Sequence, residues 1–467
     1  MTAPVCPAIL SLVVLALAVV PAGAGQLVQP SPTSTVQDPS ETTTGSGAQP
    51  DSPPPRRPYR GLFGGSEANT AADGLGLNLS GFGGYDGNVI ADQQGSVGAR
   101  RPVAGSYGGG AGTLSYLVRG NRSSFGVAGT SQLRVYRASV APAGTMQSLL
   151  MTATVPLARR VTLNIRQGVQ YSPYYQLSIM PDLPSQDAPD VAAVDLVNVD
   201  QSVTAVDTWG STTAVSAAQE LGRSSTMRYE YGYRLTDFAE GPDDRHGQNA
   251  GVSFSRRMTR YATLRLGYEY QTAESRGGLN RTQVHNLDLG GGYSRPLSFS
   301  RRTTVGFSGG TTVLQSPARG SQVRILGDAT VHHEMGRSWL ARFVVRQDAR
   351  YVEALPHPLY GYTSRGGVSG LITPRVELTI DGGYSSGRVD SGRANASYSS
   401  GTGTARVRLA VTRTLAWYTE YAYHQYAFGS GTGLAAAVAP DFQRHAVRAG
   451  LTLWIPIFTP RQGHATR

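Results

Sequence analysis

Apolar and polar side chains alternate along two neighbouring stretches of the chain, 250–255 and 262–271. In the second stretch, ATLRLGYEYQ, leucine and tyrosine alternate with Arg265 and Glu269 among others. A period of two places the two sets on opposite faces of a β-strand. A soluble core would not bury unpaired Arg and Glu. The pattern therefore predicts a strand pair with lipid on one face and water on the other, as in a transmembrane β-barrel.

The same alternation recurs along most of the chain, separated by short segments rich in Gly, Ser, Asp and Pro. It predicts about eighteen strands, with boundary errors of roughly two to four residues, near 74–85, 104–118, 124–136, 146–155, 160–171, 204–218, 225–237, 249–256, 261–272, 283–294, 302–315, 322–334, 339–352, 366–372, 375–386, 404–412, 416–428 and 445–458.

The connections between these strands supply an independent test. From the second strand onward every other connection is short, namely 120–124, 156–160, 220–225, 256–260, 295–301, 334–338, 372–375 and 412–416. Short turns on one side and longer loops on the other are typical of outer-membrane barrels, with both termini in the periplasm and an even strand count. The fold class is therefore all-β: a transmembrane antiparallel up-and-down barrel of about 18 strands (range about 16–18), with short periplasmic turns and long extracellular loops.

Composition agrees with this fold. Glycine (58 residues) and tyrosine (24) are frequent, and charged residues make up only 16% of the chain. The net charge is +11, carried entirely by Arg with no Lys. These Arg residues are spread over turns and strand faces and form no single basic patch, so we expect no nucleic-acid partner.

Residues 1–24 are predicted to be a signal peptide. An apolar run at 9–20 precedes the small residues Ala22, Gly23 and Ala24, a cleavage pattern, and is too short to span a bilayer comfortably. The only cysteine, Cys6, precedes the run, so the mature chain would have no disulfide or thiolate metal site. Composition then divides the rest into a Pro/Ser/Thr-rich periplasmic tether (25–59), the barrel (60–458) and a C-terminal tail (459–467).

Arginine recurs in the short turns, where it would approach the phospholipid headgroups of the periplasmic leaflet. A general preference of turns for polar residues is the alternative. The residues are Arg122, Arg159, Arg160, Arg223, Arg256, Arg257, Arg260, Arg295, Arg337, Arg375 and Arg413.

If the apolar positions face lipid, the alternate positions face the lumen. Arg342, Arg346 and Arg350 share one face of a predicted strand, and such rows of Arg favour anions in a pore. A ladder of neutralising cross-strand pairs, such as Arg346 with Asp328, is the alternative. The pore-lining candidates are Arg134, Arg166, Arg228, Arg265, Glu269, Arg324, Asp328, Arg342, Arg346, Arg350, Arg406, Arg408, Glu420 and Arg448.

The longest loop, 173–203, combines apolar residues with aspartates and contains no basic residue. We expect it to fold partly into the lumen as a constriction, with its acids facing the Arg rows; a cap over the outer mouth is the alternative. The constriction-loop candidates are Asp182, Asp187, Asp190, Asp195 and Asp200.

No catalytic, cofactor or metal site is predicted. Ser308 and Ser385 lie in G-x-S-x-G matches, but both fall in or at the end of predicted strands with no following helix, which the nucleophile elbow requires. Glu420 and His424 share a strand face and read as a solvated lumen pair, since no nucleophile or metal partner is visible. The chain is predicted not to be an enzyme.

Over residues 74–458 the chain resembles the porin-like outer-membrane β-barrels of Gram-negative bacteria, in its signal peptide, strand and loop alternation, and long loop after the fifth strand. It is also similar to the barrel porins found beside polysaccharide-export systems. One departure is the tail that follows Phe458, because such barrels usually end on an aromatic residue.

The resemblance implies a cell outer-membrane channel for passive or gated passage of small polar or anionic solutes or glycans. Its expected partners are outer-membrane lipid, the barrel-assembly machinery, and a periplasmic or polysaccharide-export partner. Two alternatives stay open: a plugged structural or adhesive barrel with partner-binding loops, and a barrel enzyme acting on lipid or surface polymer.

Overall fold

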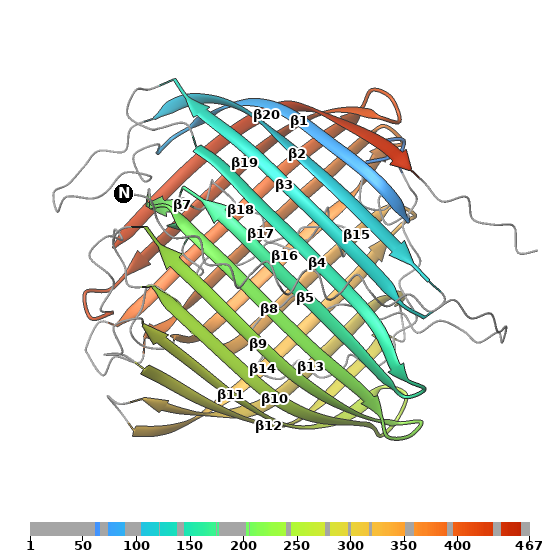
Figure 1. Ribbon diagram of the computed structural model, residues 1–467, viewed down its shortest axis with the longest axis vertical. Coiled ribbons are helices and arrows are strands. Elements are labelled where there is room, and N and C mark those ends of the chain that lie inside the picture. The colour runs from blue at the N-terminus through green and yellow to red at the C-terminus, as the bar shows by residue number, and fades with distance from the viewer. Residues whose placement is uncertain are drawn as a thin grey trace, which may run out of the picture. The chain divides into compact units, whose positions relative to one another are not determined.

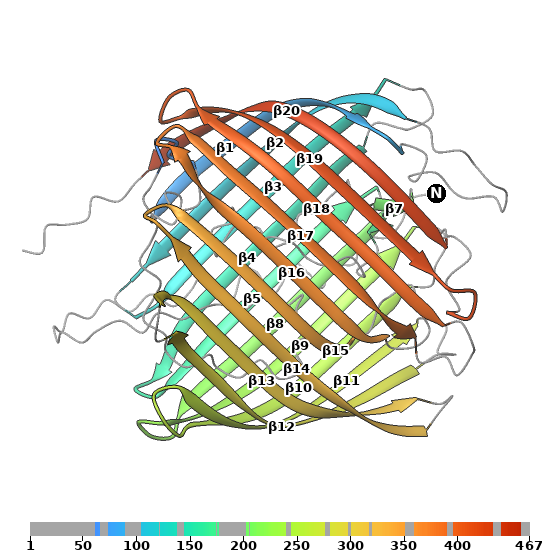
Figure 2. The same cartoon turned by 180° about the vertical axis from the view of Figure 1, so that it is seen from behind.

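The computed structural model describes residues 61–65, 73–88, 104–120, 122–137, 144–173, 175–176, 202–204, 206–239, 244–275, 281–297, 300–316, 320–350, 359–389, 396–432 and 440–458. Within these ranges eighteen strands form one antiparallel sheet (Figures 1 and 2). They are β1 (Gly74–Asp86), β2 (Gly105–Arg119), β3 (Ser124–Tyr136), β4 (Gly144–Ala158), β5 (Val161–Ser172), β8 (Thr208–Glu220), β9 (Ser225–Phe238), β10 (Arg245–Arg257), β11 (Ala262–Ser275), β12 (Arg281–Leu297), β13 (Ser300–Ser316), β14 (Gly320–Met335), β15 (Trp339–Arg350), β16 (Leu359–Thr373), β17 (Val376–Val389), β18 (Ser397–Ala410), β19 (Leu415–Phe428) and β20 (Asp441–Phe458).

Each barrel strand pairs with the barrel strands before and after it in the chain, and the first and last strands pair with each other. Along this β1–β20 seam the pairing runs from Leu75↔Phe458 to Asp86↔Ala446, with one irregularity between Leu75 and Gly76. The sheet is therefore a closed up-and-down barrel, which leaves no free edge. The predicted fold class and strand number are confirmed.

Every short connection predicted from the sequence joins two neighbouring strands at one end of the barrel, the right-hand end in Figure 1. The turn after β14 shows why its sequence suits it: Gly336 has a φ of 64°, a conformation that glycine adopts without a steric penalty. The turn arginines from Arg122 to Arg413 are all exposed at this end, as the predicted collar requires.

The two faces of the sheet differ as the alternation predicts. Large apolar side chains are exposed on the outside, for example Val323 at 71%, Ile325 at 70% and Leu289 at 61%. The intervening positions point into the barrel and carry most of the charged side chains. In the described part of the chain no helix is long and apolar enough to cross a membrane.

Two further short strands, β6 (Tyr175–Gln176) and β7 (Ser202–Thr204), pair with each other where the chain leaves and re-enters the barrel wall after β5. The residues between them, including the five aspartates of the predicted constriction loop, lie outside the described residues. So do the predicted signal peptide, tether and C-terminal tail.

At the long-loop end two strands begin seven residues before their predicted starts, more than the expected error of about two to four residues. β16 begins at Leu359 and not near 366, and β18 begins at Ser397 and not near 404. The missed segments, LYGYTSR and SYSSGTG, carry small or polar residues on both faces. They therefore lack the apolar alternation on which the prediction depends, although they continue the hydrogen-bonded ladder of their neighbours.

Candidate functional site

The candidate site is the wall of the lumen, formed by alternate residues of all eighteen strands. On β18 and β19, for example, Arg406 lies opposite Glu420, while the adjacent Val407 points outward. The predicted pore-lining residues on this inner face are Arg134, Arg166, Arg228, Arg265, Glu269, Arg324, Asp328, Arg342, Arg346, Arg406, Arg408, Glu420 and Arg448. Arg350 has the same parity on β15, but its side chain lies outside the described residues.

Much of the acidic charge on this wall is held by cross-strand partners. Arg408 Nη1 donates to Glu377 Oε2 at 2.9 Å, and Arg448 Nη2 donates to Glu420 Oε1 at 2.6 Å. Arg265 forms an ion pair with Asp288 on the next strand. Such pairs follow directly from the register, because cross-strand neighbours on one face lie about 5 Å apart.

Uncharged partners hold other carboxylates. Glu269 accepts hydrogen bonds from Asn249 Nδ2 at 3.4 Å and Asn286 Nδ2 at 3.3 Å. Ser308 donates to Asp328, which also lies directly opposite Arg346 as the ladder interpretation predicted. The carboxylates of Glu269 and Asp328 are therefore held in place by neighbouring side chains of the barrel wall.

The two serine motifs are part of the same polar wall. Ser308 lies on β13 beside Asp328, and Ser385 lies on β17 within hydrogen-bonding distance of Thr363 Oγ1 (3.1 Å) and Tyr398 Oη (3.3 Å). Neither serine stands on a turn from a strand to a helix, the geometry that makes a G-x-S-x-G serine a nucleophile.

Guanidinium groups outnumber carboxylates on the described part of the inner face away from the rims. The cations are Arg134, Arg166, Arg228, Arg234, Arg265, Arg324, Arg342, Arg346, Arg365, Arg406, Arg408, Arg444 and Arg448; the anions are Asp86, Glu230, Glu269, Asp288, Asp328, Glu377, Asp381 and Glu420. Arg234 and Arg342 are exposed although they point inward, so water can reach this wall. The lumen therefore has a net positive wall.

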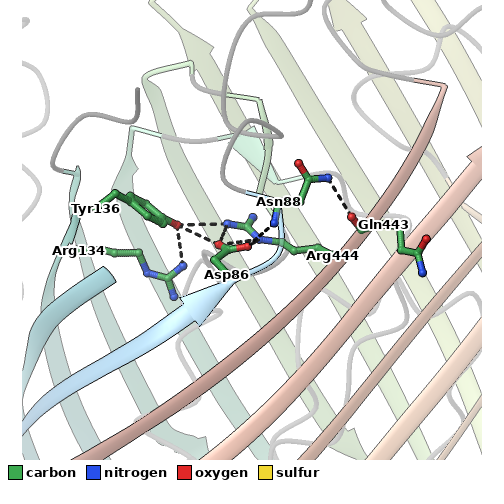
Figure 3. A network of polar contacts seen from close by, with 6 residues as sticks. All are labelled: Asp86, Asn88, Arg134, Tyr136, Gln443 and Arg444. Carbon is green, nitrogen blue, oxygen red and sulfur yellow. Dashed lines mark hydrogen bonds and ion pairs between the residues drawn. The ribbon is translucent and has the colours of Figure 1, made fainter. Parts of the chain in front are cut away.

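A second, fully buried polar group lies at the long-loop end of the barrel seam, where Figure 3 shows Arg444 of β20 beside Asp86 of β1. Arg444 Nε lies 3.0 Å from both carboxylate oxygens, and both side chains are 0% exposed. Tyr136 Oη donates to Asp86 Oδ2 at 3.2 Å, and Asn88 N donates to Oδ1 at 2.9 Å. We call these residues, together with Arg134, the seam network.

Arg134 adds a second positive charge to the seam network. Its Nη1 donates to Tyr136 Oη at 3.1 Å, and its guanidinium carbon lies 4.2 Å from the ring centroid of Tyr107. The Tyr107 and Tyr136 rings are 5.6 Å apart, and Phe82 packs against Tyr107. Arg444 thus binds the Asp86 carboxylate directly, and Arg134 is connected to it through the Tyr136 hydroxyl and lies against aromatic faces.

Sequence reasoning placed Arg134 in the lumen but missed Asp86 and Arg444. The predicted first strand stopped at 85, one residue before the end of β1, and the predicted last strand began at 445, one residue after Arg444, whereas β20 begins at Asp441. Continuing each alternation by one residue would have assigned both charges to the inner face.

No protein-family model matches the chain, and no curated protein matches it. Among solved structures it is similar to Pseudomonas aeruginosa OpdL, with 12% identity, 82% of this chain and 99% of that chain covered, and a TM-score of 0.42. It is also similar to Pseudomonas aeruginosa OccK11 (OpdR) (10% identity, 86% and 98% covered, TM-score 0.40) and to the siderophore receptor PirA from Acinetobacter baumannii (7% identity, 82% and 81% covered, TM-score 0.40). At such low identity the lumen side chains have to be understood from this chain alone.

Proposed function

We propose that the chain is an outer-membrane channel through which small polar solutes, preferentially anions, pass passively or through a gated lumen. The observation that carries this proposal is the excess of Arg over Asp and Glu on the inner face of a closed eighteen-stranded sheet. Barrels of about 16–18 strands are wide enough for an aqueous passage. A wall of fixed positive charge raises the local concentration of anions and lowers that of cations.

The distribution of the charge supports an open channel rather than a sealed structural barrel. Arg234 and Arg342 are exposed inside the barrel, whereas the outward face presents apolar side chains such as Leu266 at 50% and Phe307 at 55%. An Arg facing lipid at the bilayer midplane would cost about 2–4 kcal/mol, so the inward placement is the stable one. A sealed lumen would need these cations desolvated, which costs free energy.

Glycans are the second solute class that the proposal includes, because the exposed Arg side chains of the lumen can also donate hydrogen bonds to sugar hydroxyl groups. A role beside a polysaccharide-export system, and a periplasmic partner for the chain, belong to the same proposal. Neither has a specific contact among the described residues to support it, so small anions are the class that we place first.

Purified protein in planar bilayers tests the proposal. We expect single-channel conductance and, in a KCl gradient, a reversal potential displaced toward that of chloride. Folded protein that does not conduct at any voltage would favour the plugged structural or adhesive barrel. A reversal potential displaced toward potassium would refute anion preference while leaving the channel itself intact.

A further inference from the structure

The segment Gly61–Gly65, GLFGG, lies against the short-turn end of the barrel before the first strand begins; we call it the strap. Leu62 N donates to Pro374 O at 2.8 Å, and Gly64 N donates to Arg413 O at 2.7 Å. Pro374 belongs to the turn between β16 and β17, and Arg413 to the turn between β18 and β19. The strap is therefore hydrogen-bonded to two separate turns at the predicted periplasmic mouth.

The side chain at the centre of the strap points onto the inner wall. Phe63 is only 4% exposed and packs against Ala410 and Ala416, with Leu62 and Trp454 alongside. Ala410 and Ala416 are a directly opposed pair on the inner face of β18 and β19. Their small side chains leave the space that the Phe63 ring fills, and burying the ring there stabilises the contact.

The glycines of the strap are required by close approach. A Cβ at Gly64 would lie 2.7 Å from Trp454 Cε3 and 3.0 Å from Arg413 O. A Cβ at Gly65 would lie 2.7 Å from Trp454 Cβ and from the Phe63 ring. The backbone thus fits against the wall only because these positions have no side chain, which indicates a built docking site for the strap.

The Phe63 ring also lies close to a charged side chain of the inner wall. The Arg408 guanidinium carbon lies 5.7 Å from the centroid of the Phe63 ring, and the same guanidinium holds Glu377. Arg406, two residues further along the same face, lies opposite Glu420, which Arg448 also holds. Among the residues that the structure describes here, three guanidinium groups accompany two carboxylates, so the ring lies on the edge of a net positive part of the wall.

We propose that Phe63 is a specificity-determining residue of the channel, and that the strap narrows the short-turn mouth and shields the Arg406–Arg408–Arg448 cluster from permeating ions. This rests on the proposed channel function. When Phe63 is removed, the mouth is wider and Arg408 faces water. Conductance then increases, and the preference for anions increases with it, because an uncovered guanidinium attracts anions more strongly than one beneath an apolar ring.

The docking of the strap can be tested without any ion current. In the full chain carrying Cys6→Ser, Phe63→Cys is combined with Ala416→Cys, and the protein in outer membranes is treated with a short bifunctional methanethiosulfonate reagent. We expect a crosslink, detected as a reducible mobility shift, because the reagent can fill the space of the Phe63 ring that contacts Ala416 in the parent. Phe63→Cys with Ala214→Cys on β8, across the barrel, is the matched control and should not crosslink. Equal crosslinking of both pairs, or of neither, would overturn the proposal.

The effect on permeation is then measured with Phe63→Ala and, as the conservative control, Phe63→Leu. We expect Phe63→Ala to raise single-channel conductance and to move the reversal potential further toward chloride, while Phe63→Leu stays near the parent values. In the crosslinked Phe63→Cys/Ala416→Cys protein, a reductant should raise conductance. A crosslink without any change of conductance or selectivity in Phe63→Ala would make the strap a structural anchor only and would overturn its role in specificity. A parent protein without conductance would refute the channel function, whereas the crosslink would still report docking.

Discussion

The seam network makes a quantitative prediction about the barrel's stability. Asp86→Asn removes the carboxylate that Arg444 binds, in a network that also buries Arg134. Because Asp86 and Arg444 are both 0% exposed, water cannot replace the lost charge. Removing one partner of a buried ion pair typically costs about 3–5 kcal/mol. Since Asn keeps one oxygen that can accept from Arg444, we expect a loss near the lower end, about 3 kcal/mol.

The measurement is the free energy of unfolding of the barrel in lipid vesicles, from urea titrations monitored by tryptophan fluorescence and by the gel mobility of folded and unfolded forms. Glu230→Gln is the matched control. Glu230 lies 2.6 Å from Arg228 on β9, but the two side chains are 44% and 29% exposed. An exposed ion pair of this kind contributes about 1 kcal/mol or less, so the control variant should have a free energy of unfolding close to that of the parent.

A second variant separates lost charge from lost packing. If the cost of Asp86→Asn comes from uncompensated positive charge, adding Arg444→Met should recover part of it, giving a coupling energy of about 0.5–3 kcal/mol in a double-mutant cycle. The reasoning is wrong if the free energy of unfolding of Asp86→Asn lies within about 1 kcal/mol of the parent value. It is also wrong if the effects of Asp86→Asn and Arg444→Met on that free energy simply add.

Three further predictions concern the lumen and the wall. Arg342→Gln should reduce anion preference in reversal-potential measurements, because Arg342 is exposed inside the barrel, whereas Arg337→Gln in the exposed turn before β15 should leave it unchanged. Gly370→Ala should destabilise the barrel by about 1–3 kcal/mol in the same urea titrations, since its Cβ would lie 2.8 Å from Trp339 Cε3 and force that ring out of place. Deleting Asp182–Val199 should raise conductance and alter selectivity if that loop is a constriction; an unchanged channel would contradict the constriction.

The sequence was sufficient to predict the barrel because one physical pattern dominates it. A period of two, with apolar residues on one set of positions, has to be satisfied along every strand that faces lipid, and short turns have to alternate with long loops. Both signals are local. They failed at β16 and β18, where residues such as Gly361 and Ser399 leave neither face apolar. There the strand is held by its ladder with neighbours that the local sequence does not reveal.

The charge partners were less predictable than the strands. Arg346 and Asp328 could be proposed as a pair because their strands are adjacent in the sequence and their register follows from one turn. Asp86 and Arg444 are separated by 358 positions, and only closure of the barrel brings them together. The position of the strap could not be predicted either, because GLFGG has no apolar alternation. Its hydrogen-bond partners are the backbone carbonyls of Pro374 and Arg413, in turns that are distant in the sequence.

The seam network and the strap both depend on the last strand, and this has a consequence for assembly. Arg444 at the start of β20 binds Asp86, and Trp454 near its end packs beside Phe63 and excludes any side chain at Gly64. Neither contact can form before β20 is in place, because β20 supplies one side of each. The two contacts lie near opposite ends of β20, and the energy of the Asp86–Arg444 pair is gained only when β20 pairs with β1. A barrel lacking β20 would therefore lose the seam pairing, the buried Asp86–Arg444 ion pair and the packing of Trp454 against the strap together. We therefore expect closure of the barrel to be cooperative.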